Sequence, residues 1–234
     1  LKNYNPALAK ECIDAAEDLW QKNKNGKGRF IEAQKMQTLT ELILATNKDE
    51  YKNELYSFAP NVKQSFGWIG WSLGRILDKI DNRNFKDSIN AAAIEFKPMQ
   101  EKMLGQSPFN SPMSHTEYIA FRHYYLYKYW PDLYPASNLY SIINYLLGCK
   151  PGNSINSLVS GVGVNSPTIA YGFNRADWSY IPGGTFWNAV NLVSPDLAED
   201  KTWPFLWQER EYIITAPCYY MFSVLAADKI LNGN

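Results

Sequence analysis

The sequence predicts an all-α fold, a toroid of paired helices with one long irregular region before the last helix. Over most of the chain, apolar residues recur at spacings of three and four, the period of an amphipathic helix. Between Gly148 and about Thr215 that period is replaced by recurring glycine, proline, serine and asparagine. Aromatic residues make up 15% of the chain, more than one compact core requires, so we expect some rings to face a ligand.

The first helix is predicted from about Pro6, with Asn5 as its N-cap and Pro6 at the first helical position. The stretch NKNGKG ends it, and a second helix is expected over residues 29–45. A third helix is expected from Asn61. Its apolar residues alternate spacings of four and three: Val62, Phe66, Ile69, Leu73, Ile76 and Ile80.

The third helix has two apolar faces. At about 100° per residue, its aliphatic side chains lie within about 40° of Val62, whereas Trp71 lies opposite and Trp68 about 120° away. An inner helix of a barrel packs outward with one face and lines a central cleft with the other, which makes both indoles candidate substrate-binding groups. The alternative is that both pack against a neighbouring helix. Close approach of a neighbour is permitted under either interpretation by Gly67, Gly70 and Gly74.

Further helices are expected over residues 85–104, 114–130 and 137–147, separated by GQSPFNSP and PDLYP, and a last helix starts near Pro217. We expect one domain over residues 1–234. An irregular stretch as long as 148–215 is improbable in a compact domain unless it carries function, so these residues are predicted to be cleft-forming loops.

Composition excludes several function classes. Lys and Arg number 23, as do Asp and Glu, and no basic cluster supplies the charge that nucleic-acid binding requires. No apolar run approaches the ~20 residues of a membrane-spanning helix. The chain begins at Leu1 without an initiator methionine or a signal-like segment, so we expect an internal cut there.

No cofactor or metal site is predicted. Cys12, Cys149 and Cys218 are odd in number and lack CxxC spacing. His115 and His123 have no cysteine or paired carboxylate at ligand spacing, so we interpret them as polar residues on a helix face. The serines of the glycine-rich stretch have no nucleophile-elbow context, and GVGVNSP lacks the ending of a phosphate-binding loop.

The segment that follows the helix end INYLLG resembles part of the family-nine glycoside hydrolases, the endoglucanase family. In that family an Asn-Tyr-(aliphatic)-Leu-Gly helix end precedes a turn, a serine, an aliphatic residue, a Gly-x-Gly pair and a proline. The matching residues here are Asn144, Tyr145, Leu147, Gly148, Pro151, Ser157, Val159, Gly161, Gly163 and Pro167. The glycines are then expected to turn the backbone sharply beside the sugar cleft, where a Cβ would intrude.

The resemblance covers most of the chain and implies the C-terminal half of an (α/α)6 barrel. It is carried also by NPALAKECIDAAEDLW, HYYLYKYWPDLY and the C-terminal WQEREYIITAPCYYMFSVLAADKIL. It implies a secreted or periplasmic enzyme that hydrolyses a β-linked oligo- or polysaccharide with inversion. The family's Asp-Ala-Gly-Asp motif, which holds the attacking water, does not occur between Leu1 and Asn234. We therefore expect association with a missing N-terminal half, or with a second copy, across an open apolar side.

The family's catalytic acid is a glutamate before the final helix, and two residues match it. The downstream Ala-Pro favours Glu209, whereas the pattern of Glu followed by aliphatic residues favours Glu211. Glu211 is preferred because the following Tyr212, Ile213 and Ile214 can desolvate a carboxyl group and raise its pKa. Repulsion between the two carboxylates can also raise one pKa. The alternative is two solvated loop glutamates near Arg210.

The family places a His-His-Arg sugar-binding triplet after the Gly-x-Gly pair, and this chain has YGFNRADWSYIPGG. Arg175 is the clear counterpart, and Asn174 stands where a histidine would. With Asp177 they can hydrogen-bond sugar hydroxyls, and Trp178 or Tyr180 can stack on a sugar ring. Loss of the histidines indicates a substrate other than plain cellulose. A structural ion pair between Arg175 and Asp177 is the alternative.

Two other functions remain open on the sequence alone. One is a non-catalytic glycan-binding relative that keeps the aromatic cleft without a base. The other is a helical scaffold whose long loop binds protein.

Overall fold

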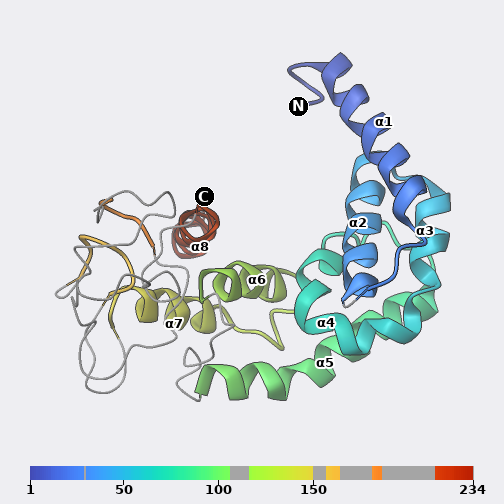
Figure 1. Cartoon of the computed structure of the whole chain (residues 1–234). Helices are drawn as coiled ribbons and strands as arrows, with labels where there is room; N and C mark the ends of the chain where they lie inside the picture. Colours follow the sequence, from blue (N-terminus) through green and yellow to red (C-terminus); the bar gives the residue numbers. More distant parts are fainter. Residues whose placement is uncertain (29, 106–115, 150–156, 164–180, 186–213, 234) are drawn as a thin grey trace. The chain divides into compact units, whose positions relative to one another are not determined.

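The computed structural model describes residues 1–28, 30–105, 116–149, 157–163, 181–185 and 214–233 (Figure 1). Eight helices lie in these ranges: α1 Pro6–Asn23, α2 Ile31–Thr46, α3 Asp49–Tyr56, α4 Ala59–Gly74, α5 Arg83–Gly105, α6 Thr116–Tyr129, α7 Ala136–Leu146 and α8 Thr215–Asn232. The described residues form no strand, only one isolated antiparallel bridge between Val159 and Thr185. The all-α class is confirmed for this part of the chain, and the toroidal arrangement stays a prediction.

The chain packs as two compact units, Leu1–Pro98 and Met99–Asn234. The boundary falls inside α5 at Pro98, a residue without the backbone N–H that an α-helix bonds to its preceding turn. The single domain expected from the sequence stays a prediction.

In the first unit, the predicted start of α1 is confirmed. The Asn5 side chain accepts a hydrogen bond from the Leu8 N–H at 3.0 Å, and Pro6 is the first helical residue. An Asn cap satisfies one of the N–H groups that a helix start leaves without a partner, and the fixed φ of proline suits this position. The indole N–H of Trp20, near the other end of α1, donates to Glu54 of α3 at 3.0 Å.

Helix α2 packs against α1, α3 and α4, and the core between them is aliphatic. Met36, Leu39 and Ile43 of α2 are fully buried, as is Leu73 of α4. Arg75, the residue after α4, forms a two-point ion pair with Glu41 of α2. The bounds predicted for this helix, residues 29–45, agree with the observed ones to within two residues at each end.

Helix α4 differs from its prediction. It begins at Ala59 and ends at Gly74, so Ile76 and Ile80 lie in the turns that follow. Both residues are nevertheless buried, at 0% and 4% exposure, because the turns fold back onto the core. The apolar spacing thus continues past the end of the helix. Gly67 has the packing role expected of it, because a Cβ there would lie 2.8 Å from the ring of Phe96 on α5.

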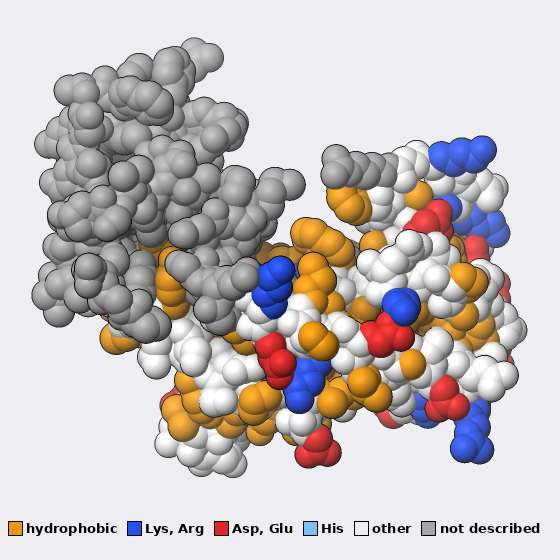
Figure 2. Space-filling view, turned by 90° about the horizontal axis from the view of Figure 1, so that it is seen from below, with side chains coloured by type: hydrophobic (Ala, Val, Ile, Leu, Met, Phe, Trp, Pro, Cys, Tyr) orange, Lys and Arg blue, Asp and Glu red, His pale blue; other side chains and the backbone are white. Residues whose placement is uncertain are grey.

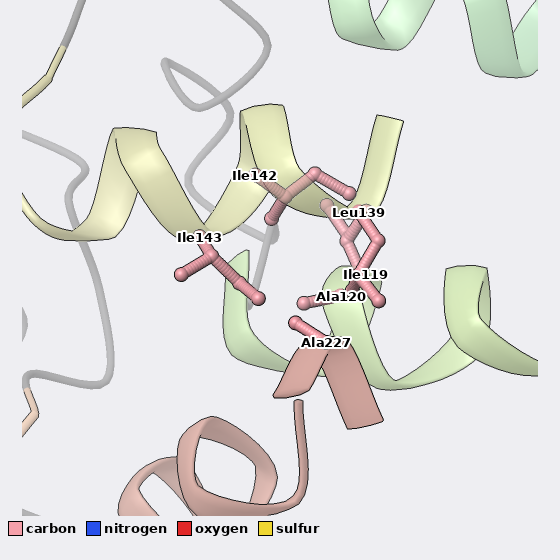
Figure 3. Close-up of a cluster of buried hydrophobic side chains, with 6 residues drawn as sticks. All are labelled: Ile119, Ala120, Leu139, Ile142, Ile143 and Ala227. Atoms are coloured by element: carbon pink, nitrogen blue, oxygen red, sulfur yellow. The ribbon is translucent and has the colours of Figure 1, made fainter. Parts of the chain in front are cut away.

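In the second unit, α6, α7 and α8 pack on one another around a small aliphatic cluster (Figure 3). Its side chains come from all three helices and meet in one contact region: Ile119, Ala120, Leu139, Ile142, Ile143 and Ala227. The two alanines let the helix backbones approach each other closely. This cluster fixes α7 beside α8, the two helices on which the candidate site is built.

His123 is buried in this unit, contrary to its interpretation as a polar residue on a helix face. Its Nε2 lies 3.1 Å from the Pro135 carbonyl oxygen, and its Nδ1 lies 3.4 Å from Gln100 Nε2. A neutral imidazole satisfies both contacts when Nε2–H donates to Pro135 and Nδ1 accepts from Gln100. Burial lowers the pKa of His123 to about 4, so the ring is neutral at physiological pH.

Because the pKa of His123 is about 4 in the folded chain, the unfolded chain binds one more proton between that pH and ~6.5. This residue should therefore lower the free energy of unfolding as the pH falls through that window, by up to about 1.4 kcal/mol per pH unit, and contribute no slope above it. Denaturant unfolding across this pH range measures the slope. His123→Gln, which cannot titrate, should flatten it. Equal slopes in the two proteins would contradict the assignment.

Candidate functional site

The candidate site begins where α7 ends. Leu147 is the C-cap, and Gly148 follows in the left-handed region with φ 86°. The Gly148 N–H donates to the Tyr145 carbonyl at 3.1 Å and the Cys149 N–H donates to the Asn144 carbonyl at 2.8 Å. This pair of bonds is the Schellman arrangement, which satisfies the last carbonyls of a helix and favours glycine at its left-handed position. The predicted end of the helix at Gly148 is confirmed to within one residue.

The chain returns to this helix end at Ser157. The Leu158 N–H donates to the Leu146 carbonyl at 2.7 Å, and the Ser157 hydroxyl lies 3.1 Å from the same oxygen. Ser157, Leu158, Val159 and Ser160 are all buried. The carbonyl that closes α7 thus receives its hydrogen bonds from a segment eleven and twelve residues further along the chain.

The two glycines of the Gly-x-Gly pair have a structural reason. Gly161 and Gly163 adopt φ 74° and 89°, where other residues are strained. A Cβ on Gly163 would lie 2.8 Å from the Leu147 carbonyl oxygen and 3.2 Å from the Ser157 Cβ. The expected sharp turn is therefore confirmed. The close approach, expected beside a sugar cleft, is made to the end of α7 instead.

A second segment, residues 181–185, pairs with the first. The Ser160 N–H donates to the Gly184 carbonyl at 2.9 Å, and the Gly183 N–H donates to the Ser160 carbonyl at 2.7 Å. The bridge between Val159 and Thr185 lies next to them. We call residues 157–163 with 181–185 the clasp. Its two parts flank residues 164–180 in the sequence, where most of the predicted sugar-binding residues lie.

The clasp is apolar inside and packs against two helices. Leu158 and Val159 form a buried cluster with Leu146 of α7, and Tyr145 and Tyr220 cover it. Burial raises the pKa of Tyr145 to about 12, so its hydroxyl stays neutral. Tyr220 belongs to α8, and the predicted acid lies shortly before this helix in the sequence. The clasp therefore contacts the helices on both sides of the irregular region.

Seven of the nine predicted site residues lie outside the described residues: Asn174, Arg175, Asp177, Trp178, Tyr180, Glu209 and Glu211. One neighbour bears on the choice between the two glutamates. Ile214, expected to help desolvate the acid, is 81% exposed. This exposure gives no support to the desolvation expected from Ile214, and the roles of Tyr212 and Ile213 stay predictions.

The other two predicted residues, Trp68 and Trp71, lie in the first unit and differ from each other. Trp68 is 50% exposed, and its ring centroid lies 6.2 Å from that of Phe30, which is also exposed. Phe30 precedes α2 with φ 63°, an unusual conformation for a bulky residue. Trp71 is buried, with the Arg75 guanidinium 5.7 Å from its ring centre. Only Trp68 therefore offers a face to a ligand.

An aromatic cluster between α6 and α8 was missed by the sequence analysis. Tyr118 and Phe121 of α6 lie 5.1 Å and 5.2 Å from the ring of Tyr219 on α8. Phe222, one turn further along α8, lies 5.0 Å from Phe121. The guanidinium of Arg122 lies 4.7 Å from the Tyr118 ring centre, within the range of a cation–π contact. Aromatic residues three and four apart in YIAFRHYYLYKYW were the available signal.

Metal-ligating and charged side chains were located on the described part of the chain. They contain no group of three or more His, Cys, Asp or Glu placed to hold a metal ion, and His115 lies outside them. Acidic and basic side chains are interspersed with hydrophobic ones on the described part of the face in Figure 2. Among the described helices, none has both the length and the apolar character that crossing a membrane requires.

No family model matches the chain, and no curated protein or solved structure shows significant similarity to it.

The two clasp glycines Gly163 and Gly183 allow a matched test of the close approach. Both have positive φ, but a Cβ on Gly183 would meet nothing within 4 Å. Gly183→Ala should therefore cost only the left-handed strain, roughly 1–2 kcal/mol. Gly163→Ala should cost a further ~1–3 kcal/mol, because the added methyl group overpacks against Leu147. Urea unfolding measures both, and equal losses would contradict the contact.

Proposed function

We propose that this chain is part of a glycoside hydrolase of the family-nine type, acting on a β-linked oligo- or polysaccharide with inversion. The observation that carries the proposal is the clasp. The resemblance rests on ten positions, and at six of them, from Asn144 to Gly163, the described backbone gives a physical reason for the residue or uses its atoms: Asn144, Tyr145, Gly148, Ser157, Gly161 and Gly163. The closed (α/α)6 toroid belongs to the same proposal.

In this proposal the segment between the clasp ends binds the sugar. Arg175 donates paired hydrogen bonds to ring hydroxyls, with Asn174 and Asp177 beside it, while Trp178 or Tyr180 stacks on the ring. Trp68, whose indole is exposed, stays a predicted stacking group of the first unit by itself. Glu211 is the general acid that protonates the leaving oxygen, and the base is expected from the half of the barrel that lies upstream.

The first test is calorimetric titration of this chain with cellotetraose, xylotetraose and mannotetraose. The proposal expects heat of binding with at least one of them, lost in Arg175→Ala. A chain that binds none of them, and no other β-linked oligosaccharide of a broad panel, would instead favour the helical protein-interaction scaffold. This test does not depend on the base, so it is made on the chain as it stands.

Catalysis is tested on the polypeptide that carries both halves of the barrel. Glu211→Gln keeps the shape of the side chain and removes its transferable proton, so kcat should fall by about 10²- to 10⁴-fold. Glu209→Gln should cost much less. Aryl glycosides with activated leaving groups should be partly spared in the Glu211 variant, because their departure needs no proton.

If Glu209→Gln lowers kcat more than Glu211→Gln does, the general acid is Glu209. If neither variant changes turnover, the catalytic role of this segment is wrong. Oligosaccharide binding without any turnover by the unmodified polypeptide would instead favour the non-catalytic glycan-binding relative, the alternative that the absence of an Asp-Ala-Gly-Asp motif between Leu1 and Asn234 supports.

The proposal includes a partner and a location. Leu8 and Leu19 of α1 are 43% and 60% exposed, and the exposed Cys12 lies between them in sequence. Such an apolar stripe supports association with the upstream half or with a second copy. Sedimentation of the chain as a concentration-independent monomer would contradict the second copy. Secretion or export to the periplasm is proposed from the resemblance alone.

A further inference from the structure

Helix α8 has apolar side chains on two opposite sides. One side is buried against α6 and α7, where Ala227 joins the cluster of Figure 3. At about 100° per residue, a second apolar set spans about 60° on roughly the opposite side. Its four residues, which we call the α8 stripe, are all exposed: Ile214, Cys218, Met221 and Leu225. A helix that is apolar on both sides usually has neighbours on both, so the α8 stripe is a candidate interaction surface.

The spacing of the α8 stripe is self-complementary. Its residues follow one another at intervals of four, three and four, an order that is the same in both directions. When two copies of α8 run antiparallel, Ile214 can therefore face Leu225 while Cys218 faces Met221. Each contact then occurs twice, about a two-fold axis. All four residues of each copy are matched with an apolar residue in this register.

The two ends of α8 are complementary in charge in the same register. Asp228, three residues beyond Leu225, comes to lie about 4.5 Å past Ile214 of the second copy. At that end of a helix the first N–H groups carry partial positive charge, which favours a carboxylate. Among the described residues, no side chain caps the first turn of α8, and no acidic residue belongs to that turn. Lys229 lies in the last turn, where a cation suits the C-terminus of its own helix.

We infer that α8 pairs antiparallel with α8 of a second copy of this chain through the α8 stripe. The inference rests on the described residues of α8 and does not depend on the glycoside-hydrolase proposal. It also names a different surface from the exposed side of α1. Because a contact between two short helices is small, the dimer is expected to be weak and reversible, with a Kd of roughly 1–100 µM.

The surface is tested by sedimentation equilibrium over roughly 1–500 µM chain, which brackets that Kd. Leu225→Glu places two charges in the apolar contact, so it should raise the Kd roughly tenfold or more. Leu231→Glu is the matched control, because Leu225 and Leu231 are 66% and 67% exposed on the same helix. Leu231 lies about 110° from the centre of the α8 stripe, so its substitution should leave the Kd unchanged. Urea unfolding checks that both variants fold.

The charge complementarity is tested by Asp228→Asn, which keeps the size of the side chain and removes its charge. The Kd should rise roughly 3- to 30-fold at low salt, because the contact with the helix N-terminus occurs twice in the dimer. The difference from the unmodified chain should shrink at high salt, which screens exposed charges. An unchanged Kd at low salt would overturn the proposed register.

The register is also tested by disulfide formation. Cys12, Cys149 and Cys218 are replaced by Ser, and Ile214→Cys and Leu225→Cys are introduced together. These two positions lie eleven residues, or about 16 Å, apart on one helix, too far for a disulfide within one chain. The antiparallel pair should therefore give a covalent dimer with position 214 linked to position 225, identified by mass spectrometry. Links between like positions would indicate a parallel pair and overturn the register.

The remaining outcomes concern other occupants of the α8 stripe. A concentration-independent monomer overturns the inference and leaves the upstream half of the proposed barrel as the occupant. A dimer that Leu225→Glu leaves intact, or that Leu231→Glu weakens equally, overturns the assignment to the α8 stripe and favours α1. A dimer with the expected link supports the inference even if the chain binds no oligosaccharide, in which case only the proposed function fails.

Discussion

The candidate site depends on one constraint, which is that the last carbonyl groups of α7 must find hydrogen-bond donors. Asn144 and Tyr145 receive theirs from Cys149 and Gly148, which requires the left-handed glycine. Leu146 receives its donors from Leu158 and Ser157, which requires the chain to return to the helix. Gly148 and the returning segment therefore both supply donors to the last carbonyl groups of α7. The returning segment is the first part of the clasp.

The clasp contains no titratable side chain in residues 157–163 or 181–185, and the hydrogen bonds described above join backbone groups and the Ser157 hydroxyl. Its geometry should therefore be insensitive to pH, and any pH dependence of sugar chemistry must come from groups attached to it. This division is common in proteins, where a rigid scaffold positions a loop that carries the chemistry. Here the scaffold is the end of α7 and the residues of the clasp that pair through their backbones: Val159, Ser160, Gly183, Gly184 and Thr185.

Local sequence signals predicted local structure well. Asn5 with Pro6 marked the start of α1, and Gly148 marked the end of α7, because caps depend on single residues. Helix α3 was missed because its eight residues are too few for a period to stand out. The pairing of Val159 with Thr185 has no periodic signature at all. The contact between α6 and α8 could not be predicted from the sequence either, although the aromatic residues that form it are evident there.

The proposed acid needs a raised pKa, and the described neighbourhood limits its sources. Ile214, the residue before α8, is largely exposed. Repulsion between Glu209 and Glu211 raises one pKa when both side chains lie on the same side of an extended segment. A bound sugar acts differently, because it displaces water from the carboxyl group only in the complex. In the proposed mechanism, Glu209 would therefore help to keep the proton on Glu211 in the free protein, and the substrate itself would help during the reaction.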